Sequence, residues 1–303
     1  MAFSVSKFFI VSLKSFLTGC IGAALVGSLA ANAEVKLLAS IKPLALIAEA
    51  VVQDKAQIDT LLPLQASPHD YALRASDMQR IHNADLVLWI GPELETFLQR
   101  PLENIPAEQR MTAYELPGLF WPKEGQETQH EASHHHDHDP HVWLDPRNAV
   151  VIARALAARL SEVDPRSAAR YRDNAEAFAA EQESLDFRLQ ALLKPLAQTG
   201  FAVYHEGYSH FAARYGLRQV AYVTLSPERR PGARHLFQLR QLLADNASCL
   251  FIEDYYDTRI GADLAQELNL RLATLDPTGK ESVKTYTQLL EQLAESFKGC
   301  LEQ

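Results

Sequence analysis

Short runs of apolar and β-branched residues alternate along the chain with segments of helical periodicity. Seven of these runs predict strands, at residues 35–41, 58–62, 86–90, 201–204, 219–225, 249–253 and 271–275. Most of the runs are apolar throughout, which is typical of strands covered on both faces in a parallel sheet. The alternation of strands with helices therefore predicts an α/β fold with mainly parallel sheets.

The most regular helical pattern lies between the first three strands and the last four. Apolar side chains from Tyr171 to Leu196 recur at helical spacings, and Asp164-Pro165 offers a cap and a first helical position. A helix from Pro165 to Lys194 would be about 45 Å long at about 1.5 Å per residue. It is long enough to contact two domains, and the chain length allows two ordinary α/β domains or one large one.

Residues 1–33 have the pattern of an export signal. Lys7 and Lys14 are followed by an uncharged apolar stretch, and Ala31-Asn32-Ala33 forms a small-x-small cleavage site. The alternative is a lipoprotein cleavage box in which Cys20 is the lipid anchor, but Lys14 would interrupt its apolar region. No later segment has the roughly 18 apolar residues of a membrane span. We therefore expect cleavage after Ala33 and an exported, soluble product.

Cleavage would leave two of the three cysteines, Cys249 and Cys300. An even pair in an exported protein predicts one disulfide, which would tie the last helix to a core strand. Two unpaired buried thiols are the alternative. The formal charge of the full chain is -9, and such a chain lacks the basic face that phosphate binding requires, so we expect no nucleic-acid partner.

Residues 124–139 form the long polar loop of the chain and carry five of its eleven histidines. Imidazole suits zinc, copper and nickel, and the aspartates between the histidines make this segment a poor candidate for the core. His141 follows the loop and precedes an apolar anchor, so we expect it to be held in place. We expect weak accessory metal binding by the five histidines of the loop, His130, His134, His135, His136 and His138. The alternative is a solvated linker that binds no metal.

Three further candidate ligands follow predicted strands: His69, His205 and Asp276. Ligands of open α/β sheets bind outside the carboxyl ends of the strands. Each residue alone is more often structural, but the coincidence of three predicts a metal site that also includes His141.

The segment from His205 to His210 superficially resembles the H-E-x-x-H motif of metalloproteases. The two histidines are five residues apart rather than four, which places the second one roughly 140° around a helix from the first. The spacing therefore argues against a protease, and we expect His210 to pack or cap locally.

Several segments match a known family and together span essentially the whole mature chain. The chain resembles periplasmic solute-binding proteins of the high-affinity zinc uptake system (ZnuA-like), within the metal-receptor cluster of ABC transporter solute-binding proteins. The resemblance rests on Ser40-Ile41-Lys42-Pro43-Leu44, Ser67-Pro68-His69-Asp70-Tyr71, Ala84-Asp85-Leu86, the histidine-rich loop, His141-Val142-Trp143-Leu144-Asp145-Pro146, His205, Pro231-Gly232-Ala233, Leu275-Asp276-Pro277 and Cys300-Leu301.

This resemblance implies two similar α/β lobes joined by one long backbone helix, with the metal in the cleft between them. The implied boundaries are residues 34–163, 164–196 and 197–303 for the first lobe, the helix and the second lobe. The implied zinc ligands are His69 and His141 from the first lobe and His205 from the second, with Asp276 or water in fourth place. The implied partners are a zinc ion and an inner-membrane ABC permease with its cytoplasmic ATPase, and we expect a periplasmic monomer.

The chain departs from the usual family pattern in two places. Glu206-Gly207 stands where Asp-Ala is usual, and Glu253-Asp254-Tyr255-Tyr256 where Glu-Pro-Gln-Phe is usual, which leaves the roles of Glu206 and Glu253 open. Manganese and iron receptors of the cluster place a second carboxylate where His205 stands, so zinc is the favoured metal. One alternative function is that of an exported zinc hydrolase, for which Glu206 is the only candidate general base. Another is that of a metal-storage protein or metallochaperone. We expect zinc capture and delivery and no catalysis.

Overall fold

The computed structural model describes residues 1–3, 34–64, 66–122, 138–228 and 230–302. Most of the predicted export signal therefore lies outside the described residues, as do His130, His134, His135 and His136 of the histidine-rich loop. The segment Glu34–Gln303 forms one compact unit. Within the described segments, no helix combines the length and the apolar character needed to cross a membrane.

A parallel sheet of four strands in the order β2-β1-β3-β4 forms the centre of the first lobe. Its strands are β1 Val35–Ala39, β2 Ala56–Thr60, β3 Leu86–Trp89 and β4 Arg110–Thr112. The helices of this lobe are α1 Lys42–Val52, α2 Ala75–Asn83, α3 Thr96–Glu103 and α4 Pro146–Val163, with 3-10 turns at Ala107–Gln109 and Val142–Leu144. Proline in the first turn of α1 and of α4 favours helix initiation there.

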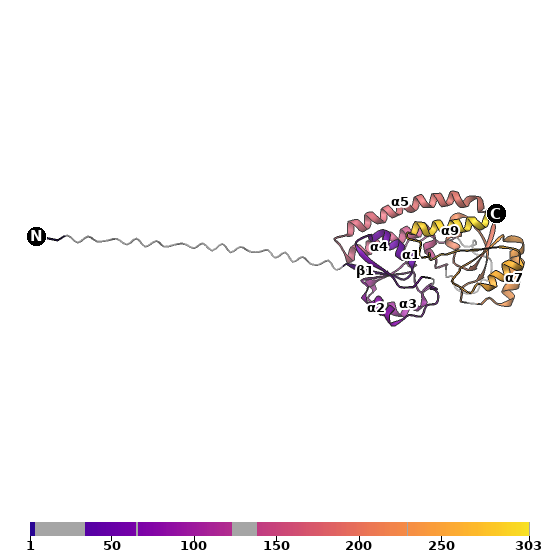
Figure 1. Ribbon diagram of the computed structural model, residues 1–303, viewed down its shortest axis with the longest axis horizontal. Coiled ribbons are helices and arrows are strands. Elements are labelled where there is room, and N and C mark those ends of the chain that lie inside the picture. The colour runs from indigo at the N-terminus through magenta and orange to yellow at the C-terminus, as the bar shows by residue number, and fades with distance from the viewer. Residues whose placement is uncertain (4–33, 65, 123–137, 229, 303) are drawn as a thin grey trace. The chain divides into compact units, whose positions relative to one another are not determined.

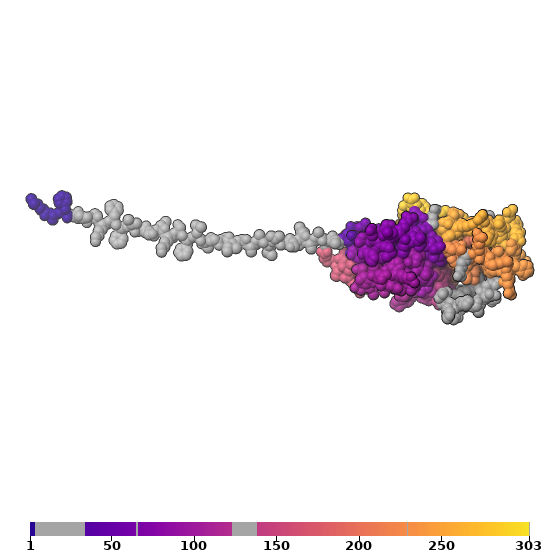
Figure 2. Space-filling view, turned by 90° about the horizontal axis from the view of Figure 1, so that it is seen from below, coloured from indigo at the N-terminus to yellow at the C-terminus, as the bar shows by residue number. Residues whose placement is uncertain are grey.

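The second lobe repeats this arrangement with the strand order β6-β5-β7-β8, again all parallel. Its strands are β5 Gly200–His205, β6 Arg218–Thr224, β7 Cys249–Ile252 and β8 Arg271–Thr274. Its helices are α6 Ser209–Tyr215, α7 Ala233–Asn246, α8 Arg259–Glu267 and α9 Tyr286–Leu301. The predicted α/β fold with two similar parallel lobes is confirmed, and the space-filling view in Figure 2 shows the two lobes in contact.

The long helix α5, Ala168–Leu193, runs alongside both lobes (Figure 1) and contacts α1 and α4 of the first and α6 and α9 of the second. It begins three residues later than the sequence predicts. Asp164 ends α4 instead, by donating its backbone N–H to the carbonyl of Leu160, and a turn separates the two helices. A 3-10 turn, Lys194–Leu196, follows the end of α5.

Strand β5 shows how the second sheet is covered on both faces. Phe201 and Val203 pack in the larger apolar core, whereas Ala202 and Tyr204 pack in a smaller cluster on the opposite face. The larger core also contains residues of β1, β3, α4 and α5, so both lobes share it. Burial on both faces agrees with the continuous apolar runs of the strands.

The predicted disulfide between Cys249 and Cys300 is present. It joins the first residue of β7 to α9, close to the end of that helix. The carboxyl end of β7, where Glu253 follows the strand, points away from this bond, so the disulfide and the strand-end residues lie at opposite ends of the sheet.

Candidate metal centre

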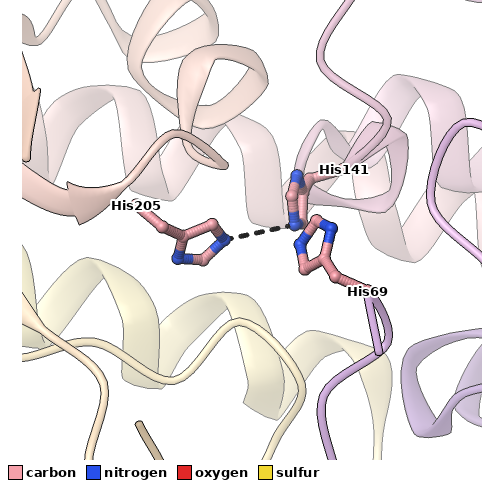
Figure 3. Close-up of side chains that lie close together, drawn as sticks. All are labelled: His69, His141 and His205. Atoms are coloured by element: carbon pink, nitrogen blue, oxygen red, sulfur yellow. Dashed lines mark hydrogen bonds between the residues drawn. The ribbon is translucent and has the colours of Figure 1, made fainter. Parts of the chain in front are cut away.

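Three histidines from separate segments converge where the two lobes meet (Figure 3). His69 lies in the loop between β2 and α2, His141 immediately precedes the 3-10 turn Val142–Leu144, and His205 is the last residue of β5. One ring nitrogen from each lies within 4.8 Å of the others. Across the described parts of the chain, these three form the one group of His, Cys, Asp or Glu side chains with metal-ligand spacing.

The position of His141 is fixed by the apolar segment that follows it. Val142, Trp143 and Leu144 are fully buried. The indole N–H of Trp143 donates to the carbonyl of Pro277 at 2.8 Å, and the hydroxyl of Tyr286 donates to the carbonyl of Trp143 at 2.5 Å. Both partners belong to the second lobe, so the segment that carries His141 is held by both lobes.

A buried carboxylate, Asp139, orients the ring of His141. Its Oδ1 lies 2.6 Å from Nδ1 of His141 and accepts the backbone N–H of the same residue at 2.9 Å. Its Oδ2 accepts the backbone N–H and the hydroxyl of Ser209, at 3.0 and 2.6 Å. With the Nδ1 proton directed at the carboxylate, the Nε2 lone pair of His141 is directed at the other two histidines.

Glu253 lies beside Nδ1 of His205, as Asp139 lies beside Nδ1 of His141. Its Oε1 lies 2.8 Å from Nδ1 of His205, within ion-pair distance, and accepts the hydroxyl of Tyr208 at 2.6 Å. The residue is fully buried. Glu253 therefore favours the His205 tautomer whose Nε2 atom is free to bind a metal.

The spacing of the nitrogens fits a tetrahedral transition metal. The Nε2 atoms of His205 and His141 are 3.4 Å apart, along the dashed line in Figure 3. Zinc–nitrogen bonds of about 2.0–2.1 Å in tetrahedral geometry place two ligand nitrogens about 3.3 Å apart. In addition, Nε2 of His69 is buried and has no hydrogen-bond partner. A cation would satisfy this nitrogen and separate the lone pairs that face each other.

The pKa values of the three imidazoles differ because their surroundings differ. Burial, together with the neighbouring His141 and His205, lowers the pKa of His69 to about 2. Burial also lowers the pKa of His141, and this outweighs the opposite effect of Asp139. Burial acts in the same direction on His205, but the carboxylate of Glu253 outweighs it, so the pKa of His205 is raised. At neutral pH, His69 and His141 are therefore neutral, the form that binds a metal.

Asp276 lies outside the group of converging nitrogens. Its Oδ1 accepts the backbone N–H and the hydroxyl of Thr278, both at 3.1 Å, and the backbone N–H of Gly279 at 2.8 Å. These bonds shape the turn that follows β8, and the role of Asp276 as a fourth ligand stays a prediction.

The histidine pair of the protease-like segment does not share a helix. His205 ends β5, whereas His210 lies in α6. The ring of His210 is buried, its Nε2 lies 2.9 Å from the carbonyl of Asp139, and Glu206 accepts the side-chain amide of Gln219 at 2.8 Å. His210 is packed as expected, but its partners are not local, because the ring contacts Asp139 and Trp121 of a distant part of the chain.

The interpretation of residues 124–139 as a poor candidate for the core is wrong at the carboxyl end of this segment. The side chain of Asp139 is only 5% exposed, and His141 and Ser209 satisfy its carboxylate oxygens. The ring of His138 stacks on Trp121 with centroids 4.9 Å apart, and its carbonyl accepts the hydroxyl of Tyr114 at 3.2 Å. The role of His138 as an accessory ligand stays a prediction.

Gly207 lies directly against the converging rings. A Cβ atom at this position would lie 2.6 Å from Nε2 of His205 and 2.9 Å from Cε1 of His141. Real Cβ atoms essentially never approach other atoms so closely. The absence of a side chain at Gly207 therefore leaves room for the His141 and His205 rings as they stand.

Two parallel α/β lobes joined by a long helix, with imidazoles from both lobes gathered at their junction, define a two-lobed metal-binding protein. The chain matches the family described as zinc-uptake complex component A, periplasmic (ZnuA), over residues 37–300, and it belongs to that family. The resemblance seen in the sequence is thereby confirmed.

Individual relatives agree with this assignment over nearly their whole length. The high-affinity zinc uptake system protein ZnuA of Yersinia pestis is 34% identical, with 89% of this chain and 92% of the relative covered. The protein of the same name from Brucella abortus is 30% identical, with 95% and 96% covered.

Solved structures show the same fold. A zinc-bound ZnuA with residues 138-173 of its own sequence deleted has a TM-score of 0.75 at 25% identity, and the match covers 88% of this chain and 98% of that one. The periplasmic zinc-binding protein TroA from Treponema pallidum has a TM-score of 0.76 at 18% identity, with 88% and 99% covered.

Proposed function

We propose that this protein is a periplasmic solute-binding protein that captures Zn²⁺ through His69, His141 and His205 and delivers it to an ABC-type permease for import. The observation that carries the proposal is the convergence of three imidazoles whose nitrogens lie within 4.8 Å of one another. Buried carboxylates behind two of the rings direct their Nε2 atoms toward the common centre. The names of the relatives in Yersinia pestis and Brucella abortus support the same function.

The donor set favours zinc over manganese or iron. Three neutral nitrogens suit the borderline zinc ion, whereas harder divalent ions prefer sites richer in carboxylate oxygen. No carboxylate belongs to the converging group among the described residues. The fourth position is proposed for water or for Asp276, as the sequence suggests.

The alternative of a zinc hydrolase requires a general base near the metal. The nearby carboxylates already have partners: Asp139 binds His141 and Ser209, Glu253 contacts His205 and Tyr208, and Glu206 binds Gln219. This engagement favours a binding protein without catalytic activity.

The proposal includes export and a membrane partner. Signal cleavage after Ala33 would release the mature protein into the periplasm, in agreement with the family description. We propose that the mature monomer docks on an inner-membrane permease whose ATPase lies in the cytoplasm. Zinc-loaded protein should stimulate that ATPase in proteoliposomes, and metal-free protein should stimulate it less.

Zinc titration calorimetry of single alanine variants tests the ligand set. Each of His69→Ala, His141→Ala and His205→Ala should weaken the tight site by at least about 100-fold, since each removes one of three protein ligands. His235→Ala is the matched control, because the ring of His235, on α7, contacts the carbonyl of Val223 at 3.1 Å, outside the triad. Wild-type affinity in His205→Ala would contradict the proposal, provided that residues 124–137 are deleted in every variant.

A further inference from the structure

The hydroxyl of Ser67 is a junction between the loop that carries His69 and the second lobe. It accepts the backbone N–H of His69 at 3.1 Å and the hydroxyl of Tyr256 at 3.2 Å, and it donates to Oε1 of Glu228. A serine hydroxyl has one donor and two acceptor lone pairs, so these three contacts use its full capacity. Two of the three partners, Tyr256 and Glu228, belong to the second lobe.

Tyr256 also contacts one of the three histidines of the metal centre. Its ring packs edge-on against that of His205, with centroids 5.9 Å apart, and it also contacts the ring of Tyr255 at 4.6 Å. Burial raises the pKa of Tyr256 above its ordinary value, so the phenol keeps its proton and remains a donor. One side chain thus contacts a ligand of the second lobe and, through Ser67, the backbone of a ligand of the first.

Glu228 is anchored on its own side of the junction. Its Oε2 accepts the hydroxyl of Ser226 at 2.5 Å, and the carbonyl of Ser226 in turn accepts the hydroxyl of Thr224, the last residue of β6, at 2.8 Å. The carboxylate that receives the Ser67 proton is therefore tied to the end of a strand.

His69 needs such an anchor more than the other two histidines do. Asp139 orients the ring of His141 and Glu253 that of His205, whereas no carboxylate pairs with the ring of His69 among the described residues. The loop around His69 is also less buried than the segments around the other two histidines. His69 is partly exposed and Asp70 is exposed, whereas His141 and His205 are buried. Through Ser67, the backbone N–H of His69 is linked to Glu228 and Tyr256 of the second lobe.

We propose that Ser67, Tyr256 and Glu228 form a clasp between the lobes that positions His69 against His141 and His205 and slows release of the bound metal. This inference rests on the proposed zinc-binding function. All three are positioning residues, because none of them offers an atom to the converging group. Because the same hydrogen bonds hold His69 and join the two lobes, His69 is in position only when the lobes are in contact.

Zinc release into excess chelator, followed by stopped flow, tests the clasp. Tyr256→Phe removes one hydroxyl and keeps the ring against His205, so release should accelerate by about 2- to 10-fold, the effect of one hydrogen bond. Ser67→Ala removes all three contacts and should accelerate release by about 10- to 100-fold, whereas Ser67→Thr should restore a rate near that of the wild type. Association rates should change little.

Non-additivity separates a shared clasp from two independent local effects. The double variant Ser67→Ala/Tyr256→Phe should release zinc no faster than Ser67→Ala alone, because the tyrosine hydroxyl has already lost its acceptor. Tyr171→Phe is the matched control: its hydroxyl lies 3.3 Å from Oδ2 of Asp164 and 3.5 Å from the carbonyl of Lys55, in the first lobe. It should release zinc at the wild-type rate.

Several results would overturn the clasp alone. These are a wild-type release rate in Tyr256→Phe, an equal acceleration in Tyr171→Phe, or fully additive effects in the double variant. Failure of the wild-type protein to hold zinc would overturn the proposed function instead, so the two ideas fail by different observations.

Discussion

His141 and His205 each pair with a buried carboxylate, Asp139 and Glu253 respectively. The sequence does not predict either pairing, and the reason differs between the two carboxylates. Asp139 lies in a stretch whose composition is that of a solvated loop, although its position two residues before His141 allows a local contact with that ring. Glu253 is the last residue of a predicted strand, and the rule that selects the strand-end residues His205 and Asp276 could select it as well. Periodicity finds the strand ends, but it does not show which side chains meet there.

Replacing Glu253 by Gln should weaken zinc binding and shift its pH dependence. Glu253 raises the pKa of His205, so protons begin to displace zinc as the pH falls through that raised value, above the ordinary value of about 6.5. Without the charge, His205 loses its proton at lower pH, and the decline in affinity should move to lower pH. At pH 8 the affinity should fall by about 10- to 100-fold, since the ring is less basic and less well oriented.

Chelator-competition titrations between about pH 5.5 and about pH 8.5 would measure both effects. Glu281→Gln changes an exposed carboxylate and should leave the profile unchanged. An unshifted profile in Glu253→Gln would show that Glu253 does not control the proton on His205.

Gly207 provides a second prediction for a single residue. Gly207→Ala places a Cβ atom against the His141 and His205 rings, and Gly207→Val adds two methyl groups that small ring movements cannot accommodate. Calorimetry should show at least a 10-fold loss of zinc affinity for the valine variant and a smaller loss for alanine. Gly232→Ala is the control, because a Cβ atom at that position would have no neighbour within 4 Å. Equal affinities in the valine and wild-type proteins would contradict this account.

At the scale of elements, the sequence predicts the long apolar runs and misses the short polar ones. It does not predict strand β4, because Arg110, Met111 and Thr112 offer one apolar side chain and too few residues for any period to show. It places the start of α5 at Pro165, since Asp164-Pro165 is a favourable helix opening, but Asp164 ends α4 instead. The spacing of apolar residues locates a helix more reliably than a single capping pair does.

Deletion of residues 124–137 separates the histidine-rich loop from the metal centre. We expect the tight zinc site to remain unchanged and weak zinc binding to disappear, because ordering a polar segment costs roughly 1 to 2 kcal/mol per residue and permits only loose sites. Extending the deletion through Asp139 should weaken the tight site, since His141 then loses the carboxylate that orients it. Calorimetry of both variants would measure this, and loss of the tight site in the shorter deletion would mean that the loop supplies a primary ligand.

At the scale of the whole molecule, one shared core and one disulfide hold the strands that present the ligands. The larger core includes side chains of both sheets and of α5, and the disulfide adds a covalent link between β7 and α9. The even cysteine pair makes this bond predictable. That β5 and β7 are neighbours is not predictable, since sheet order depends on packing that a periodic pattern does not encode.

Removal of the disulfide should reduce stability and leave zinc affinity nearly unchanged. The bond closes a loop with a sequence separation of 51, for which the chain-entropy account gives about 4 kcal/mol. We expect the variant with both cysteines replaced by serine to lose about 2 to 4 kcal/mol in the free energy of unfolding, measured in urea without zinc. Its zinc affinity should stay within about 3-fold of the wild type, because Cys249 lies at the end of β7 opposite to Glu253.

The three ligands come from segments far apart in the chain, with a separation of 64 residues between His141 and His205 alone. A chain still emerging from the ribosome, or cut short before β5, holds fewer than three of them and has no sheet to align those it has. Any precursor that remains unfolded is therefore unable to carry zinc at this site, however much zinc surrounds it. Occupancy of the triad therefore requires that β5 has been made and that the segments carrying the three histidines have folded together. Under the proposed function, a permease that recognises the loaded form would accept only folded molecules.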